Sequence, residues 1–339
     1  MKALVYLGKN RAAVQEVAKP EVKAGQALVR VRLASICGSD LTIYHGKHMR
    51  ARPPLIMGHE SAGEVVEIGG GQECRFSQGD RVVIEPIVSC GRCWWCREGR
   101  YNLCPQMRAF GVDVPGAFAE YVVAPVERIH QVPDSVELRV GVLVEPAAVA
   151  SHAVRTAGVK AGDTVAVIGG GPIGLLVALM ARIEGASAVL VLEVKPFRLG
   201  IIEKLGFVAV PGCQEGLVEA VLDLTSGQGP DVVFDAAGSP EVAQIAIPMV
   251  KRGGTVTVIG VHKQPDLVDL RLVMYREIRM GGSFSCVAQD FERALQLFAG
   301  GKLDVTKKLI THIVPLEAGE KALRTADENP DAVKVVLEI

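Results

Sequence analysis

The 339-residue sequence lacks the features that would place it among nucleic-acid-binding, membrane or secreted proteins. Its formal net charge is −1, so it carries no electrostatic footprint for nucleic acid or an anionic membrane. Its first residues contain no basic segment followed by an apolar core, which argues against a secretory leader. It has no internal repeat and no low-complexity linker. These absences predict a cytoplasmic protein whose partners are small molecules and further copies of itself.

Long apolar runs are also missing. The most apolar stretch, residues 164–181, is interrupted by glycines and a proline in its first half. A membrane-spanning helix would need about 20 consecutive apolar residues. We therefore expect no membrane segment and interpret this stretch as a buried strand, a turn and a helix.

The length suffices for two domains of the usual ~100–200 residues, and the pattern changes along the chain. Short runs fenced by Gly, Pro or Asp predict a β-rich first third, with the alternation in residues 28–33 typical of a strand buried on one face. Beyond residue 149, strand-like and helical runs alternate, which predicts βαβ units around a parallel, doubly wound sheet. The expected strands are 28–33, 64–68, 80–84, 118–123, 164–168, 188–193, 231–236, 255–259 and 333–339, and the expected helices are 173–183, 197–205, 217–224, 242–250 and 290–298.

A glycine-rich segment, GGGPIG at residues 169–174, matches the dinucleotide fingerprint G-x-G-x-x-G. It follows an apolar strand and opens an apolar helix, as phosphate binding by a helix N-terminus requires. A tight turn that binds nothing is the alternative, and the context argues against it. The candidate cofactor residues here are Gly169, Gly171, Pro172, Ile173 and Gly174.

An acidic residue, Glu193, lies 19 residues beyond Gly174, at the end of the next expected strand. A carboxylate there accepts hydrogen bonds from both ribose hydroxyls and repels a 2′-phosphate, which favours NAD over NADP. Lys195 and Arg198 follow closely and could offset part of that repulsion, and we count Arg198 among the candidate cofactor residues.

Four of the eight cysteines, Cys90, Cys93, Cys96 and Cys104, have the spacing C-x2-C-x2-C-x7-C. In a chain of cytosolic character such crowding indicates metal rather than disulfides. Four thiolates suit a tetrahedral structural zinc, which would stabilise the lobe without offering a position to substrate. An iron–sulfur cluster is the alternative.

Three short motifs contain further metal-binding residue types: CGSD at 37–40, GHE at 58–60 and EP at 145–146. Taken singly, each is unremarkable, because a lone cysteine is usually a core residue and a lone histidine a structural one. With the cysteine lobe and the glycine-rich segment, however, the chain resembles the zinc-containing branch of the medium-chain dehydrogenase/reductase superfamily, and specifically its polyol and sorbitol dehydrogenase-like members. All five features occur in that family's order.

The resemblance implies an α/β architecture. A GroES-like, β-rich catalytic domain is expected over residues 1–146, with a structural zinc lobe at about 88–106. A Rossmann NAD-binding domain is expected over 147–287, and residues 288–339 are expected to return to the catalytic domain. The resemblance also implies a homodimer or homotetramer.

The family's catalytic zinc ligands carry over to Cys37 and His59, with Glu60 and Glu145 both candidates for the third ligand. Glu60 could instead only support the site through hydrogen bonds. Ser39 matches a hydroxyl that relays the substrate proton, although it could also be a helix N-cap for the segment from Asp40.

The resemblance also marks less specific cofactor contacts. Segments 258–261 and 282–284 match those that hold the nicotinamide, with Val261 and Ser283 as candidates. His152 and Lys334 fall where the family often contacts the cofactor or the active site.

The implied reaction is zinc-dependent, NAD-linked oxidation of a secondary hydroxyl in a polyol, sugar alcohol, sugar acid or sugar phosphate. An L-threonine 3-dehydrogenase or butanediol dehydrogenase is the alternative within the same class. A non-catalytic superfamily member is the alternative from another class, although such proteins typically lack the zinc ligands. Cations in the segment 44–52, including Arg50 and Arg52, suggest an anionic substrate, or else a solvated basic loop.

Overall fold

The computed structural model describes residues 1–70, 74–212 and 216–339. The chain forms two compact units. Unit 1 contains Met1–Ala148 and Val287–Ile339, and unit 2 contains Val149–Cys286. The expected boundaries, 146/147 and 287/288, lie beside these divisions.

Unit 1 is built on β-sheets, as the short fenced runs predict. Its largest sheet has the order β10-β6-β5-β3-β18-β17, with β9 also paired to β3. A second sheet has the order β2-β1-β4, and β7 pairs with β8. The strands are β1 (Lys2–Gly8), β2 (Arg11–Glu16), β3 (Gln26–Ser35), β4 (Leu55–Ile56), β5 (Glu60–Ile68), β6 (Arg81–Ile84), β7 (Ile87–Val88), β8 (Arg108–Ala109), β9 (Tyr121–Pro125), β10 (Ile129–Gln131), β17 (Ile310–Pro315) and β18 (Lys334–Glu338).

Strand β3 is the centre of this unit. It pairs with β5, β9 and β18, all antiparallel. Val29 and Val31 are buried and Arg30 is exposed, as the alternation predicts, but Leu28 is buried too. The final strand, β18, therefore joins the sheet formed by the first part of the chain.

α-Helices and short 3-10 helices complete unit 1. The α-helices are α1 (Gly38–Tyr44), α2 (Trp94–Arg97), α3 (Leu138–Gly141), α10 (Ala288–Ala299) and α11 (Gly319–Glu328). The 3-10 turns are η1 (Tyr101–Leu103), η2 (Val126–Arg128), η3 (Asp304–Leu309) and η4 (Leu316–Ala318). Helix α4 (Val144–Ala157) begins in unit 1 and ends in unit 2.

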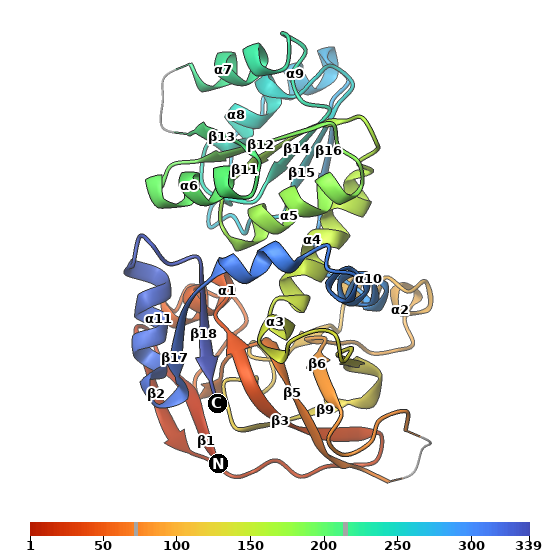
Figure 1. The fold of residues 1–339 in the computed structure, drawn as a ribbon, viewed down its shortest axis with the longest axis vertical. Helices are drawn as coiled ribbons and strands as arrows, with labels where there is room; N and C mark the ends of the chain where they lie inside the picture. Colours follow the sequence, from red (N-terminus) through yellow and green to blue (C-terminus); the bar gives the residue numbers. More distant parts are fainter. Residues whose placement is uncertain (71–73, 213–215) are drawn as a thin grey trace. The chain divides into compact units, whose positions relative to one another are not determined.

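Unit 2 contains a six-stranded parallel sheet of order β13-β12-β11-β14-β15-β16. Helices α5 and α6 lie on one face and α7, α8 and α9 on the other (Figure 1). This is the predicted doubly wound fold. The strands are β11 (Thr164–Ile168), β12 (Ala188–Glu193), β13 (Val208–Pro211), β14 (Val232–Asp235), β15 (Thr255–Val258) and β16 (Arg279–Gly282). The helices are α5 (Pro172–Ile183), α6 (Pro196–Lys204), α7 (Leu217–Leu224), α8 (Val242–Met249) and α9 (Leu270–Tyr275).

The apolar stretch 164–181 forms β11, the glycine-rich turn and most of α5. Within the described ranges, no helix is long and apolar enough to cross a membrane.

Candidate functional site

Cys37 lies where β3 ends and α1 begins. It is the N-cap residue of α1, and its backbone N–H donates to the Asp40 carboxylate at 2.9 Å. The Asp40 side chain is fully buried, and its Oδ1 lies 3.6 Å from Nδ1 of His59. Asp40 therefore fixes the start of the helix and also contacts the imidazole ring.

A glycine directly precedes His59 and Glu60, and no other residue could replace it without strain. Gly58 has φ +91°, and a Cβ there would come within 2.2 Å of the Phe118 ring. Glu60 begins β5 and pairs with Ser35 at the end of β3. The two strand ends thus bring residues far apart in the sequence to one place.

Three ligand atoms meet at this place. One each from Cys37, His59 and Glu60 lie within 4.8 Å of one another. A thiolate, an imidazole nitrogen and a carboxylate oxygen are the donor set of a zinc site that leaves a fourth position open. The arrangement therefore fits a catalytic divalent metal.

The Glu60 carboxylate has two very different oxygens. Ser35 Oγ and Lys334 Nζ both donate to Oε2. Oε1 is buried and has no hydrogen-bond partner among the described residues. Because an unpaired buried carboxylate oxygen is costly, Oε1 is an atom that a bound cation would satisfy.

Glu145 lies in the first turn of α4 and is buried, yet it contributes no atom to this group. Burial raises the pKa of Glu145 to about 7, with the nearby carboxylate of Glu60 adding to the rise and the charge of His59 opposing it. Glu145 is therefore close enough for the charges of Glu60 and His59 to shift its pKa.

The His59 ring has a polar neighbour beside each of its nitrogens. Ser39 Oγ lies 3.5 Å from its Nε2, and Asp40 lies beside its Nδ1. Burial lowers the pKa of His59, but Asp40 and Cys37 outweigh this and hold it well above the ordinary value. A metal ion at this position would compete with that proton.

Ser39 is not a helix N-cap, so that alternative is wrong. The N-cap is Cys37, and Ser39 lies inside the first turn of α1. Its hydroxyl lies beside the imidazole. The proton relay stays a prediction for this residue.

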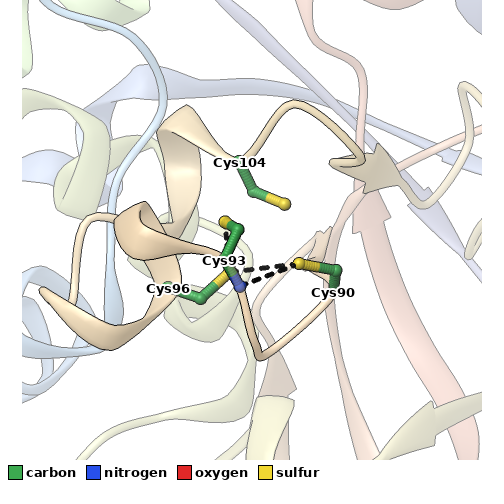
Figure 2. A group of neighbouring side chains, drawn as sticks. All are labelled: Cys90, Cys93, Cys96 and Cys104. Carbon is green, nitrogen blue, oxygen red and sulfur yellow. Dashed lines mark hydrogen bonds between the residues drawn. The ribbon is translucent and has the colours of Figure 1, made fainter.

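The four cysteines of the lobe converge as their spacing predicts (Figure 2). One sulfur from each lies within 4.8 Å of the others, and the Cys93–Cys96 sulfur distance is 3.5 Å. Backbone N–H groups of Arg92 and Cys93 lower the pKa of Cys90 to about 6. Backbone N–H groups that are already placed to donate to a thiolate suit a closed four-sulfur metal site.

In unit 2 the glycine-rich segment links β11 to α5. Gly171 is the N-cap of α5 and Pro172 begins the helix, with Ile173 following. A Cβ on Gly174 would lie 1.8 Å from the carbonyl oxygen of Gly169, and Gly169 itself has φ +105°. The tight turn and close packing therefore require glycine at both positions.

Glu193, the last residue of β12, is buried beside this segment. Its Oε2 accepts a hydrogen bond from the Gly170 N–H at 3.1 Å, and its Oε1 accepts one from Lys195 N at 2.9 Å. Arg198 Nη1 lies 3.6 Å from Oε2. Both predicted side chains thus lie at the glycine-rich turn, with Arg198 paired to the acid.

The two weaker cofactor candidates lie at the carboxyl ends of neighbouring strands. Val261 follows β15 and is 73% exposed. Ser283 follows β16, its N–H donates to Val258 O at 2.9 Å, and its buried Oγ has no partner among the described residues. Ligands of doubly wound sheets bind at such strand ends.

Sequence reasoning missed the roles of Ser35 and Asp40 and understated that of Lys334. Asp40 stands inside the CGSD motif, and a lysine at the head of the apolar strand KVVLE was a visible anomaly. Ser35 carried no signal, because only the pairing of β3 with β5 brings it to Glu60. Asp235, at the end of β14, was also missed; it accepts a hydrogen bond from Gly238 N at 2.9 Å and pairs with His262 at 2.5 Å.

Comparisons with known proteins cover both units. Residues 23–134 match the family described as alcohol dehydrogenase GroES-like domain, and residues 172–300 match zinc-binding dehydrogenase. The chain is 32% identical to sorbitol dehydrogenase of Bacillus subtilis over 96% of this chain and 93% of that one. It is 34% identical to 2-dehydro-3-deoxy-L-galactonate 5-dehydrogenase of Pseudoalteromonas atlantica over 100% and 98%. Among solved structures, alcohol dehydrogenase TADH from Thermus sp. ATN1 superposes with a TM-score of 0.93 at 32% identity, covering 100% of this chain and 99% of that one.

Proposed function

The chain belongs to the zinc-containing alcohol dehydrogenases of the medium-chain dehydrogenase/reductase superfamily and is an alcohol or polyol oxidoreductase, and from this we propose that it oxidises a secondary hydroxyl group to a ketone with NAD as acceptor. The observation that carries the proposal is the convergence of Cys37, His59 and Glu60 within 4.8 Å. The proposed substrates are polyols, sugar alcohols and sugar acids or phosphates.

We propose Glu60, rather than Glu145, as the third protein ligand of the catalytic zinc. The support is that Glu60 Oε1 is buried without a partner and that Glu145 lies outside the three-residue group. When bound there, zinc would supply a Lewis acid that lowers the pKa of a substrate hydroxyl.

The chain's own residues would handle the proton that the hydroxyl loses. Ser39 Oγ, beside the His59 ring, would accept this proton and pass it toward solvent. Asp40 would hold the imidazole in one orientation through its contact with Nδ1.

For the cofactor we propose NAD, with NADP disfavoured. The ribose hydroxyls would donate to Glu193, and the N-terminus of α5 would face the pyrophosphate. The position of Arg198, 3.6 Å from Glu193, supports this, because the acid partly neutralises the cation that a 2′-phosphate would need.

Sugar acids form a specific candidate within the substrate class. Two relatives carry names of this kind: the galactonate-derivative dehydrogenase above and L-idonate 5-dehydrogenase of Escherichia coli, whose structure superposes with a TM-score of 0.91 at 28% identity over 100% of this chain and 98% of that one. The cations of the segment 44–52 support a sugar-acid substrate only in part. Arg50 pairs with Asp113 at 3.4 Å, and Arg52 lines a cavity of about 590 Å³ whose lining contains no metal-centre residue.

L-Threonine or butanediol oxidation is the second candidate. It is supported by the L-threonine 3-dehydrogenase of Pyrococcus horikoshii, 36% identical over 89% of this chain and 87% of that one.

The experiment that tests the proposal is NAD reduction, followed by NADH absorbance, across secondary alcohols, polyols, aldonates and hydroxy-amino acids, with and without chelator. We expect chelator-sensitive turnover of polyols or aldonates. Turnover of threonine alone would favour the second candidate, and no zinc-dependent turnover of any substrate would refute the enzyme proposal.

We further propose that the four-cysteine lobe holds a second, structural zinc, and that the protein acts in the cytoplasm as a homodimer or homotetramer. Metal analysis tests the first statement, with two zinc ions per chain expected. Light scattering of the purified protein tests the oligomeric state.

A further inference from the structure

Lys334 is a buried cation in an element that does not need one. It opens β18, whose remaining core residues Val335, Val336 and Leu337 are at most 1% exposed, and Lys334 itself is 2% exposed. An ammonium group removed from water is costly unless it is paired and hydrogen-bonded. Its retention in an apolar strand therefore calls for a specific partner.

That partner is Glu60. Lys334 Nζ donates to Glu60 Oε2 and also lies 3.3 Å from the carbonyl oxygen of Ile36, the residue before Cys37. The pairing of β18 with β3 sets this geometry, because Val336 lies opposite Ser35 and Ile36 N donates to Val335 O at 2.9 Å.

Ser35 is the second donor to the Glu60 carboxylate. Its hydroxyl donates to the same oxygen, Glu60 Oε2. Two donors on Oε2 and none on the buried Oε1 fix the rotation of the carboxylate and leave one oxygen uncommitted.

We infer that Lys334 is a positioning residue: by holding Glu60 Oε2, it makes Oε1 the oxygen presented to a metal ion bound by Cys37 and His59. This inference rests on the proposed function, because it takes these three residues as metal ligands. Lys334 touches neither substrate nor metal in this role and acts only through Glu60.

A simpler role for Lys334 would be to balance the negative charge of the buried carboxylates. The two roles predict opposite results when the ammonium is removed. Loss of a mere counter-charge would strengthen the binding of a divalent cation, since a nearby positive charge opposes it. Loss of a positioning contact would weaken binding and change the ligand geometry, as loss of such supporting contacts typically does by about 10–100-fold.

The test replaces the catalytic metal with cobalt(II), whose visible spectrum reports ligand geometry. The wild type is expected to show a thiolate-to-cobalt charge-transfer band that Cys37→Ser removes, which separates this centre from the cysteine lobe. In Lys334→Met we expect shifted d–d bands and cobalt binding weaker by about 10–100-fold in chelator competition. The matched control, Lys307→Met, removes an exposed lysine paired with Glu137 and should change neither.

Ser35→Ala keeps the test decisive even if Lys334→Met does not fold. It removes the other donor to Oε2 with little change in volume, and we expect a smaller change in the same direction. Lys334→Arg, which keeps the charge and the donors, should restore part of the wild-type spectrum.

The outcomes separate this inference from the proposed function. Unchanged bands in both Lys334→Met and Ser35→Ala, or tighter cobalt binding in Lys334→Met, would overturn the positioning role alone. Absence of a Cys37-dependent band in the wild type would overturn the metal site, and the inference with it. Neither readout requires the substrate to be known.

Discussion

At the scale of single residues, Glu60 and Glu145 are two buried carboxyl groups with different surroundings. Glu60 is held by a cation and a hydroxyl, whereas burial raises the pKa of Glu145 to about 7. Desolvation disfavours the ionised form of a carboxyl group. Glu60 thus offers a cation one buried oxygen that has no other partner among the described residues, whereas burial favours the protonated form of Glu145.

This contrast predicts different results for two isosteric substitutions. Glu60→Gln should weaken binding of the catalytic zinc and abolish most turnover, because an uncharged amide replaces a ligand. Glu145→Gln should retain zinc and lose less activity. Zinc content by elemental analysis, with kcat for the best substrate, measures both. Loss of one zinc from Glu145→Gln but not from Glu60→Gln would reverse the ligand assignment.

The proposed preference for NAD over NADP also depends on one residue, Glu193. Glu193→Ala should raise the KM for NAD by about 10–100-fold, since hydrogen bonds to a charged acceptor contribute about 1.5–3 kcal/mol. It should also improve kcat/KM for NADP, because Arg198 loses the acid beside it. Glu203→Ala, a change near the end of the following helix, α6, provides the control. An unaltered NAD to NADP ratio in Glu193→Ala would contradict the assigned role.

At the scale of elements, the cysteine lobe contains only short helical segments. Helix α2 has four residues and none of them is buried, and η1 is a single turn. Elements this short do not persist on backbone hydrogen bonding alone. A metal bound by the four sulfurs, as proposed, would therefore add to the stability of the lobe.

Removing one of these sulfurs should unfold the lobe without emptying the catalytic centre. For Cys104→Ser we expect one zinc per chain instead of two, faster proteolysis within residues 88–106 and a lower Tm. Cys74→Ser, at a half-buried cysteine outside the group, is the control. Two zinc ions retained in Cys104→Ser would show that the lobe does not bind metal through this residue.

Elements with strong local periodicity could be predicted from sequence and those that depend on partners could not. The strand 164–168 was predicted with the bounds of β11, and 173–183 falls within α5, because the apolar pattern and the glycine-rich turn are local signals. The expected strand 118–123 is displaced from β9, whose residues pair with β3. Strand β16 was not predicted, because its RMGG sequence has little strand propensity and pairing with β15 stabilises it.

The residues of the candidate site likewise divide into those with a local sequence signal and those that depend on strand pairing. Cys37 and His59 stand in motifs that can be matched by eye, so they were predicted. The grip of Lys334 and Ser35 on Glu60 depends on two strand pairings across the whole of unit 1. No spacing rule in a single sequence contains that information.

At the scale of the whole molecule, each of the two units contains an apolar cluster of its own residues. One unit contains the proposed metal centres and the other the proposed dinucleotide site. Each ligand should therefore stabilise its own unit, since a ligand stabilises the structure that binds it.

Calorimetry should separate the two effects. We expect two thermal transitions, with NAD at about 100 times its Kd adding about 2.7 kcal/mol to the unit 2 transition and a chelator lowering the unit 1 transition. The Glu193→Ala variant should lose most of the NAD effect and keep the chelator effect. A single transition that both reagents move together would show that the units unfold as one.

The position of Lys334 in the chain has a consequence for biosynthesis. The ribosome synthesises Cys37, His59 and Glu60 before unit 2, and it synthesises all of unit 2 before β18. Translation proceeds at about 5–20 residues per second, so Lys334 is synthesised roughly tens of seconds after Glu60. During that interval the nascent polypeptide exposes a thiol, an imidazole and an unanchored carboxylate to the cellular pool of metal ions. Acquisition of the correct metal is thus expected to be post-translational, when the last strand closes the sheet.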